Sequence, residues 1–191
     1  MFLIFFGVLL NIHAADHPQH SVEREQGLVP DKDTAVRVAE AVLIPIYGTE
    51  LTFKEKPLTA VLTNEMWIIK NNSRPNSETN IILRISKKDA RISLVNAAKH
   101  ALQASRRGQG VVPDATTAAR IAEAVLTPIY GQELVSHERP FKSVLKEKVW
   151  IVQGTLHQGL MDRFFGPTKG GVGIVELSRE DAAILRVSHG K

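Results

Sequence analysis

The fold is decided by a stretch that occurs twice: VPDKDTAVRVAEAVLIPIYG at residues 29–48 returns as VPDATTAARIAEAVLTPIYG at residues 112–131. The offset between the two copies is 83 residues, and it continues without a gap until Trp67 aligns with Trp150. An ordered match of this length indicates an internal duplication rather than chance similarity.

Each copy predicts one helix followed by a small sheet. Asp31 and Asp114 follow a proline and precede apolar residues at helical spacing, so each is expected to cap a helix at its N-terminus. Gly48 and Gly131 suit the left-handed exit from a helix. Hydrophobicity then alternates with a period of two, which predicts four strands per copy. The expected strands are 58–62, 66–70, 81–85 and 92–95 in the first copy, and 141–145, 149–155, 172–177 and 184–187 in the second.

The sequence therefore predicts an α+β protein made of two tandem units, each with one helix and a four-stranded antiparallel sheet. The first unit spans residues 29–96, a linker spans 97–110, and the second unit spans 111–191. The start of the linker could form a short helix over 97–105. A unit of roughly 70 residues has a thin core, which favours packing of the two units into one body.

The first fifteen residues have the pattern of an export signal. Phe2 to Leu10 is an uninterrupted apolar run, and Ala14 and Ala15 offer small residues to a signal peptidase. The run is too short to span a bilayer, and no other segment predicts membrane insertion. We expect residues 1–15 to be removed and residues 16–28 to form a flexible lead-in. A buried N-terminal strand is the alternative.

Composition excludes several classes of protein. The chain has 191 residues, 43% of them hydrophobic and 23% charged, as in a packed globular protein. It has no cysteine, which excludes disulfides and thiolate chemistry. A net charge of +4 and an aromatic content of 6% do not favour a nucleic-acid partner.

Few residues carry the pattern of an active site or a cofactor site. The seven histidines lack the close spacing of a metal site, and Gly166 to Gly171 has the wrong order for a phosphate loop. Each helix carries an arginine and a glutamate that can meet on one face, namely Arg37 with Glu40 and Arg120 with Glu123. For such pairs a structural role is favoured over a catalytic role. We therefore expect no catalytic residues, no metal and no cofactor. Both tryptophans are expected in the core.

Most of the nine extra residues of the second copy lie in TLHQGLMDRFFGPTK, residues 155–169. Exposed aromatic and arginine side chains are typical of interface hot spots. The residues expected to contact a partner are His157, Arg163, Phe164, Phe165 and Lys169. The alternative is that the two phenylalanines cover the core or bind the first copy.

The second copy resembles the bacterial immunity proteins with a nuclear-transport-factor-like (cystatin-like) fold that are known from polymorphic-toxin loci. The resemblance covers about 80 residues and rests on an ordered set of motifs. These motifs are Val112-Pro113-Asp114, Ala118 to Leu126, Pro128 to Gly131, Glu133, Arg139-Pro140-Phe141, Val149 to Val152, Gly154, Gly170-Gly171-Val172 and Leu185 to Lys191. The first copy lacks the paired glycines and the His-Gly-Lys ending.

The resemblance implies an immunity protein that neutralises a cognate secreted toxin during interbacterial competition, for example by type VI secretion. Together with the leader, it implies a periplasmic protein and a toxin that acts on the envelope, such as a cell-wall hydrolase. A homodimer is left open. The alternatives are a periplasmic protein whose pocket binds a small ligand or carries an enzymatic activity, and an envelope structural adaptor.

Overall fold

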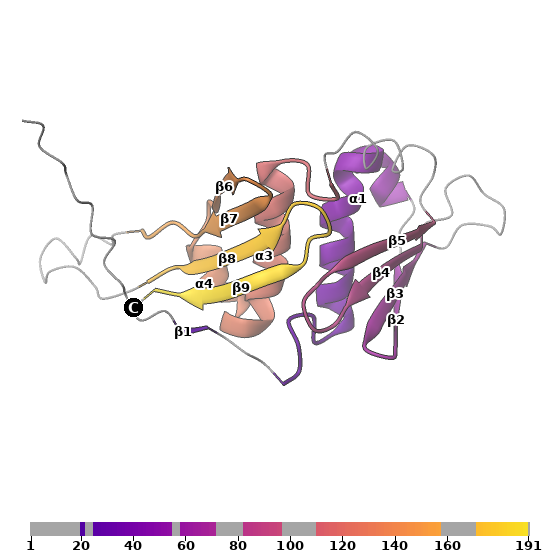
Figure 1. Cartoon of the computed structure of the whole chain (residues 1–191), viewed down its shortest axis with the longest axis horizontal. Coiled ribbons are helices and arrows are strands. Elements are labelled where there is room, and N and C mark those ends of the chain that lie inside the picture. The colour runs from indigo at the N-terminus through magenta and orange to yellow at the C-terminus, as the bar shows by residue number, and fades with distance from the viewer. Residues whose placement is uncertain are drawn as a thin grey trace, which may run out of the picture.

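The computed structural model describes residues 20–21, 25–54, 58–71, 82–96, 110–157 and 171–190. It confirms the α+β prediction, with one helix-plus-sheet unit per copy (Figure 1). The first unit consists of α1 (Lys32–Lys54), β2 (Thr59–Thr63), β3 (Met66–Lys70), β4 (Ile82–Ser86) and β5 (Ile92–Asn96). The second consists of α3 (Ala115–Tyr130), α4 (Gln132–His137), β6 (Lys142–Lys146), β7 (Val149–Gln153), β8 (Gly173–Ser178) and β9 (Ile184–His189).

Both sheets are antiparallel meanders, and their strands match the predicted ranges to within one or two residues. The first sheet has the order β2-β3-β4-β5, and the second has the order β6-β7-β8-β9 with β1 (His20–Ser21) added beside β9. Because side chains alternate along a strand, Trp150 and Val152 of β7 point to the covered face and Gln153 to solvent. The export signal expected over residues 1–15 and the helix expected over 97–105 lie outside the described residues.

The N-caps predicted for the two helices are confirmed. A carboxylate oxygen of Asp31 accepts a hydrogen bond from the backbone N–H of Thr34 at 2.8 Å, and Asp114 accepts one from Thr117 at the same distance. Each bond satisfies one of the amides that a helix start leaves without an intrahelical partner.

The helical conformation is interrupted at the expected glycines, but the path of the chain beyond them differs from the prediction. Gly48 has a φ of 78° inside α1, and Gly131 has a φ of 90° between α3 and α4. In both units the chain then resumes a helical path, which the sequence did not predict. In the second unit the continuation is α4, and its Val135 is fully buried. Burial of this side chain favours a short helix at a position where local signals predict only an exit.

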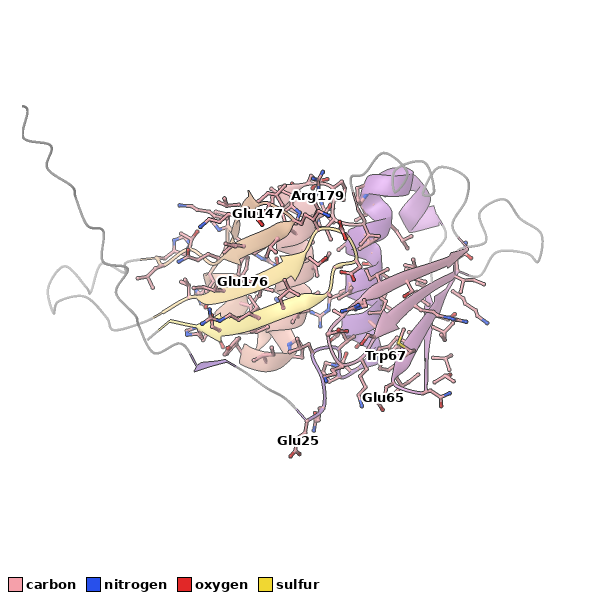
Figure 2. The ribbon with its side chains drawn as sticks, in the orientation of Figure 1. Glu25, Glu65, Trp67, Glu147, Glu176 and Arg179 are labelled. Atoms are coloured by element: carbon pink, nitrogen blue, oxygen red, sulfur yellow. The ribbon has the colours of Figure 1, made fainter. Side chains whose placement is uncertain are left out.

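The tryptophans lie in the core, as predicted. Trp67 (Figure 2) and Trp150 are each 7% exposed. The indole N–H of Trp67 donates to the carbonyl oxygen of Val29 at 2.9 Å, and that of Trp150 donates to Val112 at 3.0 Å. Each tryptophan thus ties the second strand of its sheet to the residue that precedes its helix.

The segment before each helix is also held by the last hairpin of its own sheet. Val29 donates to the carbonyl of Lys87 at 3.0 Å, and Val112 donates to that of Arg179 at 3.1 Å. Gly110 precedes this contact with a φ of +66°, and a Cβ there would lie 2.1 Å from the carbonyl oxygen of Arg179. A glycine is therefore needed at this close approach.

The predicted lead-in is anchored in two places. Leu28 donates a hydrogen bond to the carbonyl of Lys88 at 3.1 Å, within its own unit. His20 and Ser21 pair with His189 and Ser188 of β9, in the other unit. This strand pairing was not predicted, because two polar residues carry no alternating pattern.

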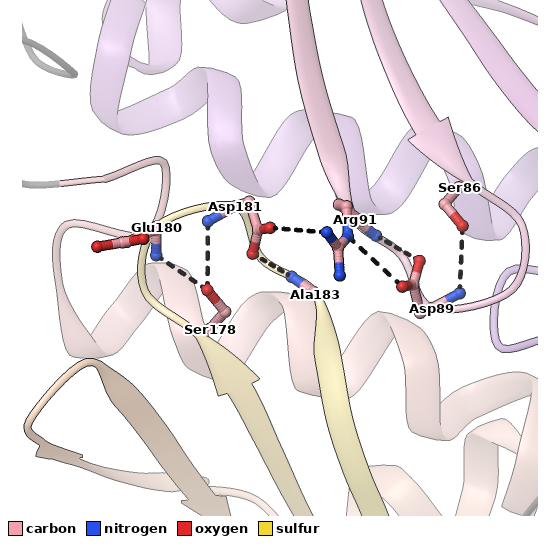
Figure 3. A network of polar contacts seen from close by, with 7 residues as sticks. All are labelled: Ser86, Asp89, Arg91, Ser178, Glu180, Asp181 and Ala183. Atoms are coloured by element: carbon pink, nitrogen blue, oxygen red, sulfur yellow. Dashed lines mark hydrogen bonds and ion pairs between the residues drawn. The ribbon is translucent and has the colours of Figure 1, made fainter.

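The two units meet in a reciprocal way at their last hairpins (Figure 3). Ile92 donates its backbone N–H to the carbonyl of Asp181 at 2.7 Å, and Ile184 donates to that of Asp89 at 2.7 Å. Each donor and each acceptor has its equivalent 92 residues away. The contact is therefore isologous, as at the two-fold axis of a homodimer.

The pseudo-two-fold arrangement extends to the helices and the core. α1 and α3 each contact strands of their own sheet, and they also contact each other at the centre of the molecule (Figure 1). Buried residues of both units form one continuous hydrophobic cluster, from Val29 to Val187. The units thus form one body.

Candidate functional site

The extra segment of the second unit leaves the sheet after β7 and re-enters it at β8. Of the residues predicted to contact a partner, His157 lies in the described part of the chain and is exposed. A ring nitrogen of His157, Nε2, lies 2.5 Å from the carbonyl oxygen of Arg139. Arg163, Phe164, Phe165 and Lys169 fall within 158–170, outside the described residues, and their role stays a prediction.

A buried glutamate, Glu138, contacts both ends of this segment. Glu138 directly follows α4 and is 7% exposed. Its Oε2 accepts a hydrogen bond from the backbone N–H of Gly173 at 2.8 Å, where the segment returns. Its backbone carbonyl accepts one from Thr155 at 2.7 Å, where the segment leaves. One residue therefore fixes both ends.

Glycines make room for this carboxylate. A Cβ on Gly154 would lie 2.5 Å from Oε2 of Glu138, and one on Gly173 would lie 3.1 Å from the same atom. Gly171 packs so closely on the backbone of Gly190 that a Cβ would lie 1.8 Å from it. These glycines therefore serve close packing, since the backbone positions leave no space for a side chain.

The end of β9 completes the cluster. Nε2 of His189 lies 3.2 Å from Oε1 of Glu138, and Nδ1 lies 2.7 Å from the carbonyl oxygen of Gly190. The ring of His189 also contacts that of Tyr130, with centroids 5.0 Å apart. The last turn of α3 and the last strand are thus joined to the base of the segment. We call Tyr130, Glu138, Gly154, Gly173 and His189 the anchor cluster.

An ion pair lies beside the anchor cluster. Arg139 pairs with Glu123 of α3, and the hydrogen bond and charge of Glu123 raise the pKa of Arg139 above its usual value. The helical spacing would also allow Glu123 to meet Arg120 on the same helix. The structure pairs it instead with a residue sixteen positions later, which the chain reversal after α4 brings alongside.

The anchor cluster belongs to the second unit alone. At the aligned positions the first unit has Asn71 for Gly154, Ile81 for Gly173 and Ala97 for His189. It keeps a glutamate, Glu55, and a tyrosine, Tyr47. The residues that close around the carboxylate are therefore specific to the unit that carries the extra segment.

The described residues contain no group of three or more histidines, aspartates or glutamates placed to hold a metal ion. Within the same ranges, no helix is both long and apolar enough to cross a membrane. The arrangement around Glu138 can fix both described ends of the extra segment on the second unit.

Sequence reasoning did not identify Glu138 as a site residue. Its partners Gly173 and His189 lie 35 and 51 positions away, and no local spacing predicts such contacts. The available signal was Gly154, a glycine at the end of an apolar strand where no turn requires one.

Comparison with known families identifies the class of protein. The profile described as "NTF2 fold immunity protein" matches residues 34–99 and 117–191, one match in each unit. Together these segments cover most of the chain, and the chain belongs to this family of immunity proteins.

A relative from Escherichia coli (strain K12), described as "Uncharacterized protein YhhH", is 30% identical to this chain over 83 residues. The matched region is 44% of this chain and 60% of the relative, so the chain spans less than two thirds of the relative's length. No solved structure matches the chain significantly.

Proposed function

We propose that this immunity protein neutralises its cognate toxin by binding it through the extra segment of the second unit. The contact residues would be His157, Arg163, Phe164, Phe165 and Lys169. Inhibition then needs no catalysis, because a bound protein can cover an active cleft or block a required movement. The observation that carries the proposal is the anchor cluster, which fixes both ends of the segment to the core of one unit only.

The chemistry of the segment supports the same role. A protrusion on a stable scaffold can vary in sequence without changing the core beneath it. Phenylalanine supplies apolar contact area, and arginine can bond a carboxylate through two parallel hydrogen bonds. His157 is exposed at the base of the segment, so a partner that covers the segment can also contact His157.

The test is a variant that combines Arg163→Ala, Phe164→Ala and Phe165→Ala. We expect binding of the toxin encoded beside this protein to weaken by about 2 kcal/mol or more, about thirtyfold in affinity. Calorimetry with the purified toxin measures the affinity, and thermal melting checks that the variant is folded.

The matched control is Arg74→Ala, Asn76→Ala and Thr79→Ala, between the corresponding strands of the first unit. This control is expected to bind the toxin as tightly as the unsubstituted chain. A folded segment variant with undiminished affinity would refute the proposed site. Loss of binding in the control variant alone would move the site to the first unit.

We also propose that the protein acts in the periplasm against a toxin of the cell envelope, after removal of residues 1–15. The apolar run and the small residues at Ala14 and Ala15 support this. N-terminal sequencing of protein from its native host is expected to begin at Ala15 or Asp16. An intact Met1 on cytoplasmic protein would contradict export and favour a toxin that acts in the cytoplasm.

A further inference from the structure

A cavity of about 300 Å³ lies between α1 and α3. From α1 it is lined by Arg37, Glu40, Ala41 and Ile44, and from α3 by the four residues 83 positions further on. The lining is thus the same four helix positions taken twice, so the cavity lies on the pseudo-two-fold axis. Neither unit alone contains it.

The carboxylates of this cavity are already engaged. Glu123 is paired with Arg139, which approaches it from the start of the chain segment after α4. Glu40 takes part in an interaction as well. Among the described residues, neither Glu40 nor Glu123 forms an ion pair with Arg37 or Arg120.

The guanidinium groups are not engaged in the same way. Nε of Arg37 is buried, and it makes no hydrogen bond in the described part of the chain. Arg120, its equivalent on α3, has no ion pair among the described residues either. A buried guanidinium N–H without an acceptor costs free energy, which an anion in the cavity would recover.

We propose that this cavity binds a small oxyanion, a carboxylate or a phosphate, between Arg37 and Arg120. Guanidinium groups present planar pairs of donors that match both kinds of oxyanion. Ala41 and Ala124 also line the cavity, and their side chains are small. They leave room for a ligand and offer an apolar surface to the short carbon chain of a dicarboxylate. The volume is at the lower end of the range for ligand pockets, which excludes a large ligand.

The proposal does not depend on toxin binding, because the described residues that line the cavity belong to α1 and α3. It adds a ligand site that requires both units. Arg37 and Arg120 occupy the same helix position in the two copies. Anion binding gives both arginines a role, whereas pairing with Glu40 and Glu123 within each helix does not explain them.

The experiment is calorimetry of the full-length chain with succinate and, separately, with inorganic phosphate, up to millimolar concentration and at constant chloride. Saturable binding of one anion per chain is expected for at least one of the two. The anion that binds more tightly shows whether the cavity prefers a dicarboxylate or a phosphate as its ligand. Binding of neither anion overturns the proposal.

Substitutions locate the site. Arg37→Gln and Arg120→Gln are each expected to weaken anion binding by roughly tenfold or more, while melting without anion checks the fold. Arg84→Gln is the matched control, since it removes the same charge from an exposed position on β4 and should leave affinity unchanged. Because Arg120 is exposed, its variant keeps the test valid if Arg37→Gln does not fold. Unchanged affinity in folded Arg120→Gln protein refutes the site.

Discussion

Trp67→Ala and Trp150→Ala are each expected to lower the free energy of unfolding by about 3–5 kcal/mol. Both side chains are 7% exposed and belong to the hydrophobic cluster shared by the two units. Each substitution opens a cavity and also leaves the carbonyl oxygen of Val29 or Val112 without its indole donor. Urea denaturation measures the loss.

The chain offers a matched control for this pair. Val61 and Val144 occupy equivalent positions on the first strands of the two sheets and are 61% and 57% exposed. Their alanine variants are expected to stay within about 0.5 kcal/mol of the unsubstituted chain. A tryptophan variant as stable as these controls would show that its side chain lies outside the core, and would make that position a candidate contact for a partner.

Glu138→Ala is expected to destabilise the protein by roughly 3 kcal/mol. The substitution leaves the buried N–H of Gly173 without an acceptor and removes the carboxylate partner of His189. Glu138→Gln keeps an oxygen for Gly173 and should recover part of the loss. Urea denaturation again provides the measurement.

Glu180→Ala serves as the comparison for Glu138. Glu180 pairs with Lys148 at 2.7 Å, but its side chain is 62% exposed, and exposed pairs contribute little to stability. If Glu138→Ala proves no more harmful than Glu180→Ala, then the N–H of Gly173 reaches water and the anchor cluster does not hold the segment. Toxin binding by folded Glu138→Ala protein would further show whether the anchoring matters for recognition.

Local features of this fold were predictable because their causes lie within a few residues. Asp31 and Asp114 cap helices through amides three positions away, and the strands follow from alternating hydrophobicity. Because the duplication repeats each of these signals, a prediction made for one copy could be checked against the sequence of the other copy. The buried tryptophans follow from the same alternation.

The features that escaped prediction depend on contacts between distant residues. Glu138, directly after α4, meets His189 of β9 across 51 positions of sequence. Arg139 likewise pairs with Glu123 from sixteen positions away, a contact that no local spacing predicts. The cavity between α1 and α3 requires the relative placement of two units, which no periodicity within one unit specifies.

The hairpin contact between the units has a consequence for how the two copies evolve. In a homodimer a substitution near the axis appears twice, whereas here Arg91 pairs with Asp89 and Asp181 while the aligned position in the second unit is Ala183. A covalent linker also holds the units at an effective concentration in the millimolar range. Their mutual affinity can therefore be modest, and one copy can accumulate changes suited to a partner while the other continues to support it.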